Sequence, residues 1–129
     1  MSETPIIVKT QEGIFDLTAS IMKVGQDFVV IIWGGERPHV GAVALAQSRK
    51  SLRDPDKISA TASVLCLVGH KEDVVVKIAS ERLAAIADRP VAVAAGIHWD
   101  NLKETDFSQI FKNLDRLIQM IEPYLRAPR

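Results

Sequence analysis

The three histidines of this chain have similar surroundings, because each follows an apolar run and stands close to glycine. His39 lies in "GGERPHVG", His70 in "VGHKED" and His98 in "AGIHWDN". Imidazole exchanges a proton near neutral pH, so histidines that meet at one place could act as general acid and base. They could equally donate hydrogen bonds to a polar ligand. For each histidine taken alone, a solvated loop side chain is the simpler alternative.

Three imidazoles could also ligate a metal ion, as they do in several zinc sites. The chain has no H-E-x-x-H motif and no other spacing typical of metal ligands. We therefore predict no metal site.

The residues around the histidines favour a ligand that is anionic at one end and flat at the other. Arg37 and Lys71 are cations, and "GHKED" precedes a predicted helix whose first N–H groups attract anions. The alternative for that segment is an ordinary helix start whose acidic residues complement the dipole. Trp33 and Trp99 adjoin two of the loops, where they could stack on a ring or close the rim of the core. Neither G-x-G-x-x-G nor G-x-x-x-x-G-K-[ST] occurs, so no standard nucleotide cradle is predicted.

Hydrophobic periodicity indicates the elements that must position these residues. Alternation or short apolar runs predict strands, and spacing of three to four residues predicts helices. The strands are expected at 6–10, 14–22, 28–33, 42–46, 60–68 and 91–97, and the helices at 72–88 and from about 106 to 121. Asp106 and Gln109 fit a capping box at the start of the second helix. A charged loop is expected at 50–59.

This order of elements predicts an α+β fold: one two-layer domain with a mixed, mostly antiparallel sheet of about six strands and two helices on one face. The first four strands are expected to form a meander. The strand at 91–97 is apolar on both faces and is expected to be central. If it runs parallel to the strand at 60–68, His70 and His98 emerge at one edge, and His39 joins them if the strand at 28–33 is parallel too. The sheet face without helices would be apolar, so we expect a homodimer.

Composition excludes several classes of function. Lys and Arg number 16, as do Asp and Glu, so no net field favours nucleic acid or an anionic membrane. "MSETPIIVKT" lacks the regions of a signal peptide, and no apolar run approaches the roughly 18–20 residues of a membrane span. The single cysteine, Cys66, excludes an internal disulfide and fits a reducing compartment. We expect a cytoplasmic protein with one domain over 1–129.

Taken in order, "GGERPHVGAVALA", "GHKED" and "AGIHWDN" resemble the small accessory subunit of bacterial gallate decarboxylase, the LpdD-like family. The similarity extends from about Phe15 through the final helix. This resemblance implies a chaperone for reduced prenylated flavin mononucleotide (FMN), which serves UbiD-type decarboxylases. It also implies a fold like that of the proteasome-assembly chaperones, and a carrier with no catalytic residues of its own.

A carrier of this flavin needs an anion site, a flat apolar slot and protection from solvent and oxygen. Arg37 and Lys71 are expected to meet the phosphate, Trp33 or Trp99 the ring system, and Asp100 a polar edge. The full set of cofactor-binding candidates is Gly34, Gly35, Arg37, His39, Gly41, Gly69, His70, Lys71, His98, Trp99 and Asn101. Two alternatives stay open: a small hydrolase or transferase using His70 or His98 as general base, and a structural subunit that binds only the decarboxylase polypeptide.

Overall fold

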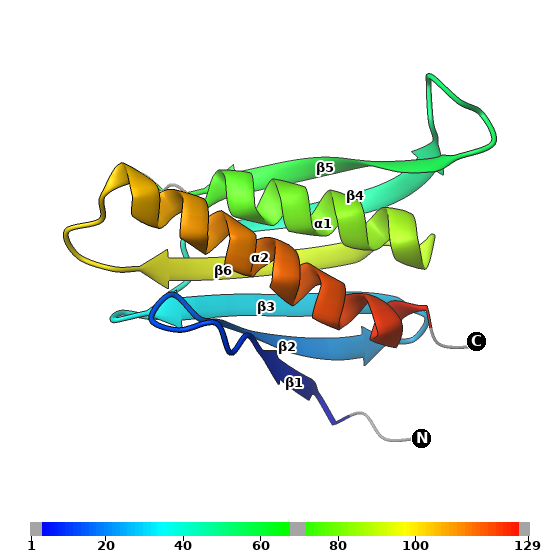
Figure 1. The fold of residues 1–129 in the computed structure, drawn as a ribbon. Coiled ribbons are helices and arrows are strands. Elements are labelled where there is room, and N and C mark those ends of the chain that lie inside the picture. Colours follow the sequence, from blue (N-terminus) through cyan, green and yellow to red (C-terminus); the bar gives the residue numbers. More distant parts are fainter. Residues whose placement is uncertain (1–3, 68–71, 127–129) are drawn as a thin grey trace.

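The computed structural model describes residues 4–67 and 72–126, which form six strands and two helices (Figure 1). In chain order these are β1 (Ile6–Lys9), β2 (Leu17–Val24), β3 (Asp27–Gly35), β4 (Ala42–Lys50), β5 (Ile58–Cys66), α1 (Asp73–Ala87), β6 (Val91–His98) and α2 (Glu104–Leu125). The number and type of the elements agree with the sequence-based expectation. None of the helices described is both long and apolar enough to span a membrane.

The strand order β1-β2-β3-β6-β4-β5 differs from the expected meander. The meander ends at β3, because β6 lies between β3 and β4 and pairs with both. β3 and β6 are parallel, and every other pair is antiparallel. Since β5 and β6 both run antiparallel to β4, they share a direction, as expected, but they are not neighbours. The prediction that β6 is central is confirmed, and β3, β5 and β6 all end at the same edge of the sheet.

β2 begins later than its pattern predicted. Leu17, Ala19 and Ile21 alternate as buried residues. The residues before Leu17 instead form a turn, in which Asp16 Oδ1 accepts hydrogen bonds from Glu12 N (2.7 Å) and the Thr10 hydroxyl (2.8 Å). An Asp side chain that bonds backbone N–H groups nearby competes with strand pairing, and this explains the shift.

β4 is longer than predicted and continues to Lys50, where it pairs with the first residue of β5, Ile58. The charged loop therefore shrinks to 51–57. Its ends are closed by Ser51 N, which donates to Lys57 O at 2.9 Å.

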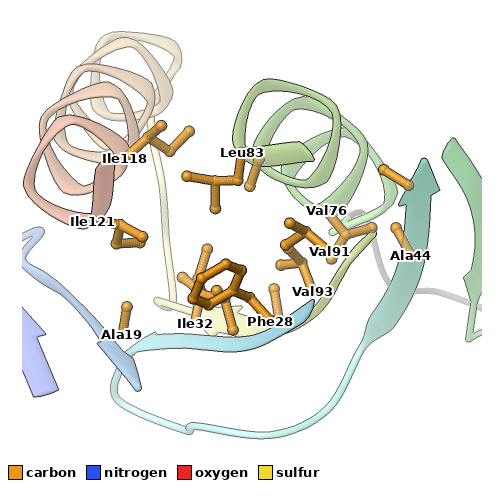
Figure 2. Close-up of a cluster of buried hydrophobic side chains, with 14 of the residues drawn as sticks. Ala19, Phe28, Ile32, Ala44, Val76, Leu83, Val91, Val93, Ile118 and Ile121 are labelled. Atoms are coloured by element: carbon orange, nitrogen blue, oxygen red, sulfur yellow. The ribbon is translucent and has the colours of Figure 1, made fainter. Parts of the chain in front are cut away.

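Both helices pack on the same face of the sheet (Figure 1). α1 covers β4, β5 and β6, while α2 lies over β1 and β2 and against α1. Between the layers, Leu83 of α1 and Ile118 and Ile121 of α2 approach Ile32 and Val93 of the sheet (Figure 2), and all five are essentially inaccessible to solvent. Each such side chain contributes about 1.5–3 kcal/mol of transfer free energy. This core fixes both helices relative to the strand ends that carry the candidate site.

The start of α2 corrects the predicted capping box. The helix begins at Glu104, two residues earlier than expected, and Asp106 accepts a hydrogen bond from Lys103 N at 2.8 Å. Gln109 takes no part in the cap and donates to Asn113 Oδ1 one turn later. Asp106 therefore stabilises the helix start as its third residue.

The opposite face of the sheet carries a continuous apolar row. Strand register aligns Ile31 of β3, Ala94 of β6, Val43 of β4 and Leu65 of β5 side by side. The three large side chains of this row are exposed. We call this row the bare-face row.

Candidate functional site

The segment 36–41, which carries Arg37 and His39, connects β3 to β4 by crossing the end of β6. Glu36 N donates to His98 O at 2.8 Å at one end of the crossing, and Gly41 N donates to Ala95 O at 2.8 Å at the other. A side chain at Gly96 would overlap the His39 carbonyl. The connection is therefore not the tight hairpin that a meander would contain, and its polar residues are held against the end of a buried strand.

Three of the predicted glycines have protein atoms as close neighbours. Gly35 has φ +91°, and a Cβ there would overlap the His98 carbonyl. Gly41 lies against the Glu72 carboxylate, and Gly34 against Leu17 and the Trp99 ring. These glycines are needed for the packing of this end of the sheet, whether or not a ligand approaches them.

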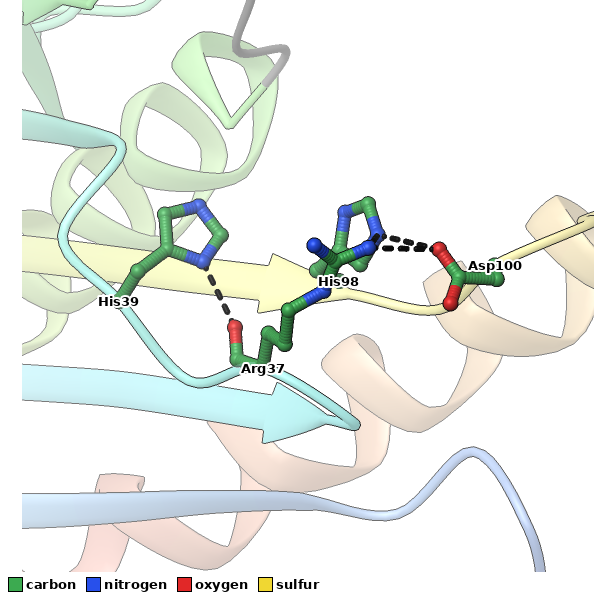
Figure 3. A network of polar contacts seen from close by, with 4 residues as sticks. All are labelled: Arg37, His39, His98 and Asp100. Carbon is green, nitrogen blue, oxygen red and sulfur yellow. Dashed lines mark hydrogen bonds and ion pairs between the residues drawn. The ribbon is translucent and has the colours of Figure 1, made fainter.

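Arg37, His98 and Asp100 form an exposed polar cluster at the crossing (Figure 3). Arg37 Nη2 lies 2.8 Å from Asp100 Oδ1 and 3.0 Å from His98 Nε2. His98 Nε2 is also 2.9 Å from Asp100 Oδ1. The hydrogen bond that Asp100 accepts from His98, followed by the one that it accepts from Arg37, holds the pKa of Asp100 below its ordinary value. The Arg37 side chain is 69% exposed, so most of its N–H groups face solvent.

His39 belongs to a second, more buried polar contact with Glu72, the residue that precedes α1. His39 Nε2 lies 2.8 Å from Glu72 Oε1, and Ile97 N donates to the same oxygen at 3.2 Å. The Glu72 side chain is only 7% exposed. The sequence offered Glu72 only as one of the acidic residues that would complement the helix dipole, in the alternative interpretation of "GHKED". Its contact with His39 was missed, because the two residues are 33 positions apart and no local pattern marks the pair.

A largely apolar cavity of about 390 Å³ opens beside these two contacts. It lies at the end of the covered sheet face, between the starts of α1 and α2. Its lining residues are Glu72, Val74, Val75, Ile97, His98, Trp99, Leu102, Phe107, Ile110 and Phe111. Val74, Phe107 and Phe111 are partly exposed and mark its mouth. The sequence showed these apolar residues only as helix faces, since nothing in a periodic pattern distinguishes core from cavity wall.

The two tryptophans have different positions. Trp99 lines the cavity and also packs against the core, with its ring edge-to-face to Phe15 at 5.2 Å. Trp33 does not line it. Trp33 and Trp99 both line a second, more polar hollow of about 440 Å³, together with Pro38. Trp99 is therefore the better placed of the two to contact a ring in the apolar cavity.

The structure brings Arg37, His39 and His98 together at one edge of the sheet, with Trp99 beside them. Asn101 lies in the exposed turn before α2, with φ +59°, and does not line the cavity. Gly69, His70 and Lys71 fall outside the described residues, so the meeting of all three histidines stays a prediction. Within the ranges 4–67 and 72–126, no group of three or more His, Cys, Asp or Glu side chains is arranged to hold a metal ion.

Charge divides the site into two parts. The first turns of both helices carry carboxylates at Asp73, Glu104 and Asp106, which disfavour an anion there. Arg37 supplies positive charge at the crossing, and His98 touches both Arg37 and the cavity. The cavity therefore suits an uncharged flat group, and Arg37, paired with Asp100, is the cation that lies beside it.

Comparison with known proteins gives two findings. The sequence model of a family described as "Prenylated flavin chaperone LpdD-like domain" matches residues 11–126. Among solved structures, the chain is similar to one from a chaperone complex for yeast 20S proteasome assembly, with a TM-score of 0.53 at 10% identity. That similarity covers 95% of this chain and 97% of the other, and it confirms the expected fold. No curated protein sequence matches the chain.

Proposed function

We propose that this chain, which belongs to the prenylated flavin chaperone LpdD-like family, binds reduced prenylated FMN and delivers it to a UbiD-type aromatic acid decarboxylase. The protein acts as a carrier and performs no chemistry on its cargo. The observation that carries this proposal is the apolar cavity, whose wall residue His98 also contacts the exposed cation Arg37.

The ring system is assigned to the cavity. A volume of about 390 Å³ falls within the range of roughly 300–1,000 Å³ that small-molecule sites occupy. Trp99, Phe107 and Phe111 provide aromatic surface for a flat ring. Burial there would also shield a reduced flavin from solvent and oxygen.

The phosphate is assigned to Arg37, because a dianion needs cationic or N–H partners. Asp100 Oδ1 accepts from Nη2 of the guanidinium, and the other N–H groups of Arg37 are proposed to bind the anion. Because the Arg37 side chain is mostly exposed, we expect it to contribute less to the free energy of phosphate binding than a buried cation would. His70 and Lys71 stay in the proposal as predictions from the sequence, as do Gly34, Gly35, His39, Gly41, Gly69 and Asn101.

The test is an anaerobic titration of the purified protein with reduced prenylated FMN, followed by addition of an apo-decarboxylase. We expect saturable binding, and decarboxylase activation that is faster with the loaded carrier than with the same concentration of free cofactor. No binding, or binding without gain in activation, would contradict the carrier function. Flavin turnover that is lost on changing His98 would instead favour an enzyme.

We also propose that two copies associate through the bare-face row, since it runs across the four neighbouring strands β3, β6, β4 and β5 and its three large apolar side chains are exposed. A two-fold dimer would bury Ile31, Val43 and Leu65 of both copies. Light scattering is expected to give twice the monomer mass at micromolar concentration, and a monomer there would contradict this proposal. A cytoplasmic location is proposed as well, supported by the single cysteine.

A further inference from the structure

The Glu72 carboxylate lies where three segments meet. It contacts His39 of the crossing segment at 2.8 Å and the backbone N–H of Ile97 in β6 at 3.2 Å, and it directly precedes α1. Gly41, which ends the crossing, leaves the room that this carboxylate occupies. Glu72 also lines the apolar cavity. One buried acid therefore joins the cavity wall to the segment that carries Arg37.

His39 transmits this contact to Arg37 through the backbone. Its Nδ1 lies 2.9 Å from the Arg37 carbonyl oxygen (Figure 3). A carbonyl oxygen only accepts, so Nδ1 carries the hydrogen of this bond, and Nε2 is left to share a proton with Glu72. Both ring nitrogens are thus held, and the imidazole has one orientation. The position of the Arg37 backbone follows from it.

The Arg37 guanidinium lies beside the cavity wall. Arg37 Nη2 and His98 Nε2 lie 3.0 Å apart and both contact Asp100 Oδ1, and His98 lines the same cavity as Glu72. The contacts form a closed circuit that starts and ends in the cavity wall: Glu72, His39, the Arg37 backbone, the Arg37 side chain and His98. Without these contacts the Arg37 side chain would occupy several rotamers. Binding of an anion would then cost the conformational entropy of fixing one of them.

We propose that Glu72 and His39 are a positioning pair, which fixes Arg37 relative to the cavity so that the ring and the phosphate of one ligand are bound together. The inference rests on the proposed function for the identity of the ligand. Neither residue is assigned a contact with the phosphate. Their effect on phosphate binding passes through Arg37.

The experiment compares two probes, reduced prenylated FMN and its dephosphorylated form, prenylated riboflavin. Both are titrated anaerobically at low ionic strength, where the contribution of an exposed charge is largest. The measured quantity is the ratio of their affinities, which isolates the phosphate. A variant that merely loosens the fold lowers both affinities and leaves this ratio unchanged.

Arg37→Ala is expected to lower the ratio about threefold, as suits an exposed charge pair. Glu72→Ala and His39→Ala are expected to lower it as much as Arg37→Ala does, and the double variant Arg37→Ala/Glu72→Ala no further. Glu72→Gln keeps an acceptor oxygen and is expected to give a smaller fall. Glu81→Gln makes the same chemical change on α1 at an ion pair with Lys77, and it is expected to leave the ratio unchanged.

Other results would overturn the positioning pair or the proposed function. An unchanged ratio in Glu72→Ala, with a lowered ratio in Arg37→Ala, overturns the positioning pair and leaves the proposed function intact. A double variant with a lower ratio than either single variant also overturns it, because the two residues would then act independently. If the unsubstituted protein binds neither probe, or binds both equally, the proposed function fails at the ring or at the phosphate, and the inference falls with it.

Discussion

Two neighbouring residues of β3 show how differently the two faces of the sheet are used. Ile32 points toward the helices and is fully buried, whereas Ile31 points to the bare face and is 45% exposed. The covered face is filled by side chains from both layers and holds the fold together. The bare face leaves its apolar surface available to another molecule. The cavity combines both properties: it belongs to the covered face, but side chains do not fill it, so its apolar surface is available to a ligand.

The sharpest test of this difference is the same substitution on both faces. Ile32→Ala is expected to lower the free energy of unfolding by about 2–5 kcal/mol, because it leaves a void in a packed core. Ile31→Ala removes the same atoms from a partly exposed position and is expected to cost under about 1 kcal/mol. Denaturant unfolding of both variants, at a concentration where the protein is monomeric, measures the two values. Equal losses would show that the faces are not distinct.

A charge on the bare face should separate assembly from folding. Ile31→Lys is expected to convert a dimer into a monomer, since it would bury an unpaired cation at the proposed interface. The fold of each copy should persist, as judged by circular dichroism. Leu52→Lys, in the exposed loop between β4 and β5, is the matched control and should keep the dimer. A dimer that survives Ile31→Lys would place the interface elsewhere.

The apolar cavity at the end of the covered face predicts a smaller effect, which concerns the affinity for the ligand. Phe111→Ala removes aromatic surface from the cavity mouth and is expected to weaken binding of reduced prenylated FMN by about 1–2 kcal/mol. Tyr124→Ala, at a similarly exposed position later in α2, should not change the affinity. Anaerobic titration of both variants gives the comparison. Equal weakening in the two would remove the ring from this cavity.

The smallest expected effect concerns the exposed cluster beside the cavity. The pKa of Asp100 lies below its ordinary value, with His98 as the larger cause and Arg37 as the next. A lowered pKa means that the contribution of this carboxylate to stability is present above the unfolded value of about 3.9 and is lost as the pH falls through the folded value. NMR titration of the Asp100 carboxyl should show this, and Arg37→Ala should move the pKa upward. A carboxyl that titrates normally would mean that the cluster does not persist in solution.

Much of the fold could be predicted because each strand and helix carries its own pattern. Alternation in β2 places Leu17, Ala19 and Ile21 on one face, which the structure shows to be the buried one, and the two-sided apolar content of β6 placed it inside the sheet. The order of the strands could not be predicted in the same way. Strand pattern specifies which face of a strand is buried but not which strands are its neighbours, so nothing local showed that β6 enters between β3 and β4.

In the candidate site too, some residues carry a local signal in the sequence and others depend on distant partners. The sequence drew attention to Arg37, His39, His98 and Trp99 through their residue types and their places beside strand ends. Glu72 and the apolar lining of the cavity were missed, since their role depends on partners that are distant in the chain. The crossing of 36–41 over β6 brings these partners together.

From the sequence alone, the number and type of the elements and the family could be predicted. These properties follow from local patterns and from motifs that are read along the chain. Tertiary structure decided the position of β6, the contact of His39 with Glu72 and the cavity between the two helix starts. These features arise from contacts across 25 or more positions, such as Glu72 with Ile97, and a contact of that kind forms only when the packing of the whole sheet and both helices has fixed where each segment lies.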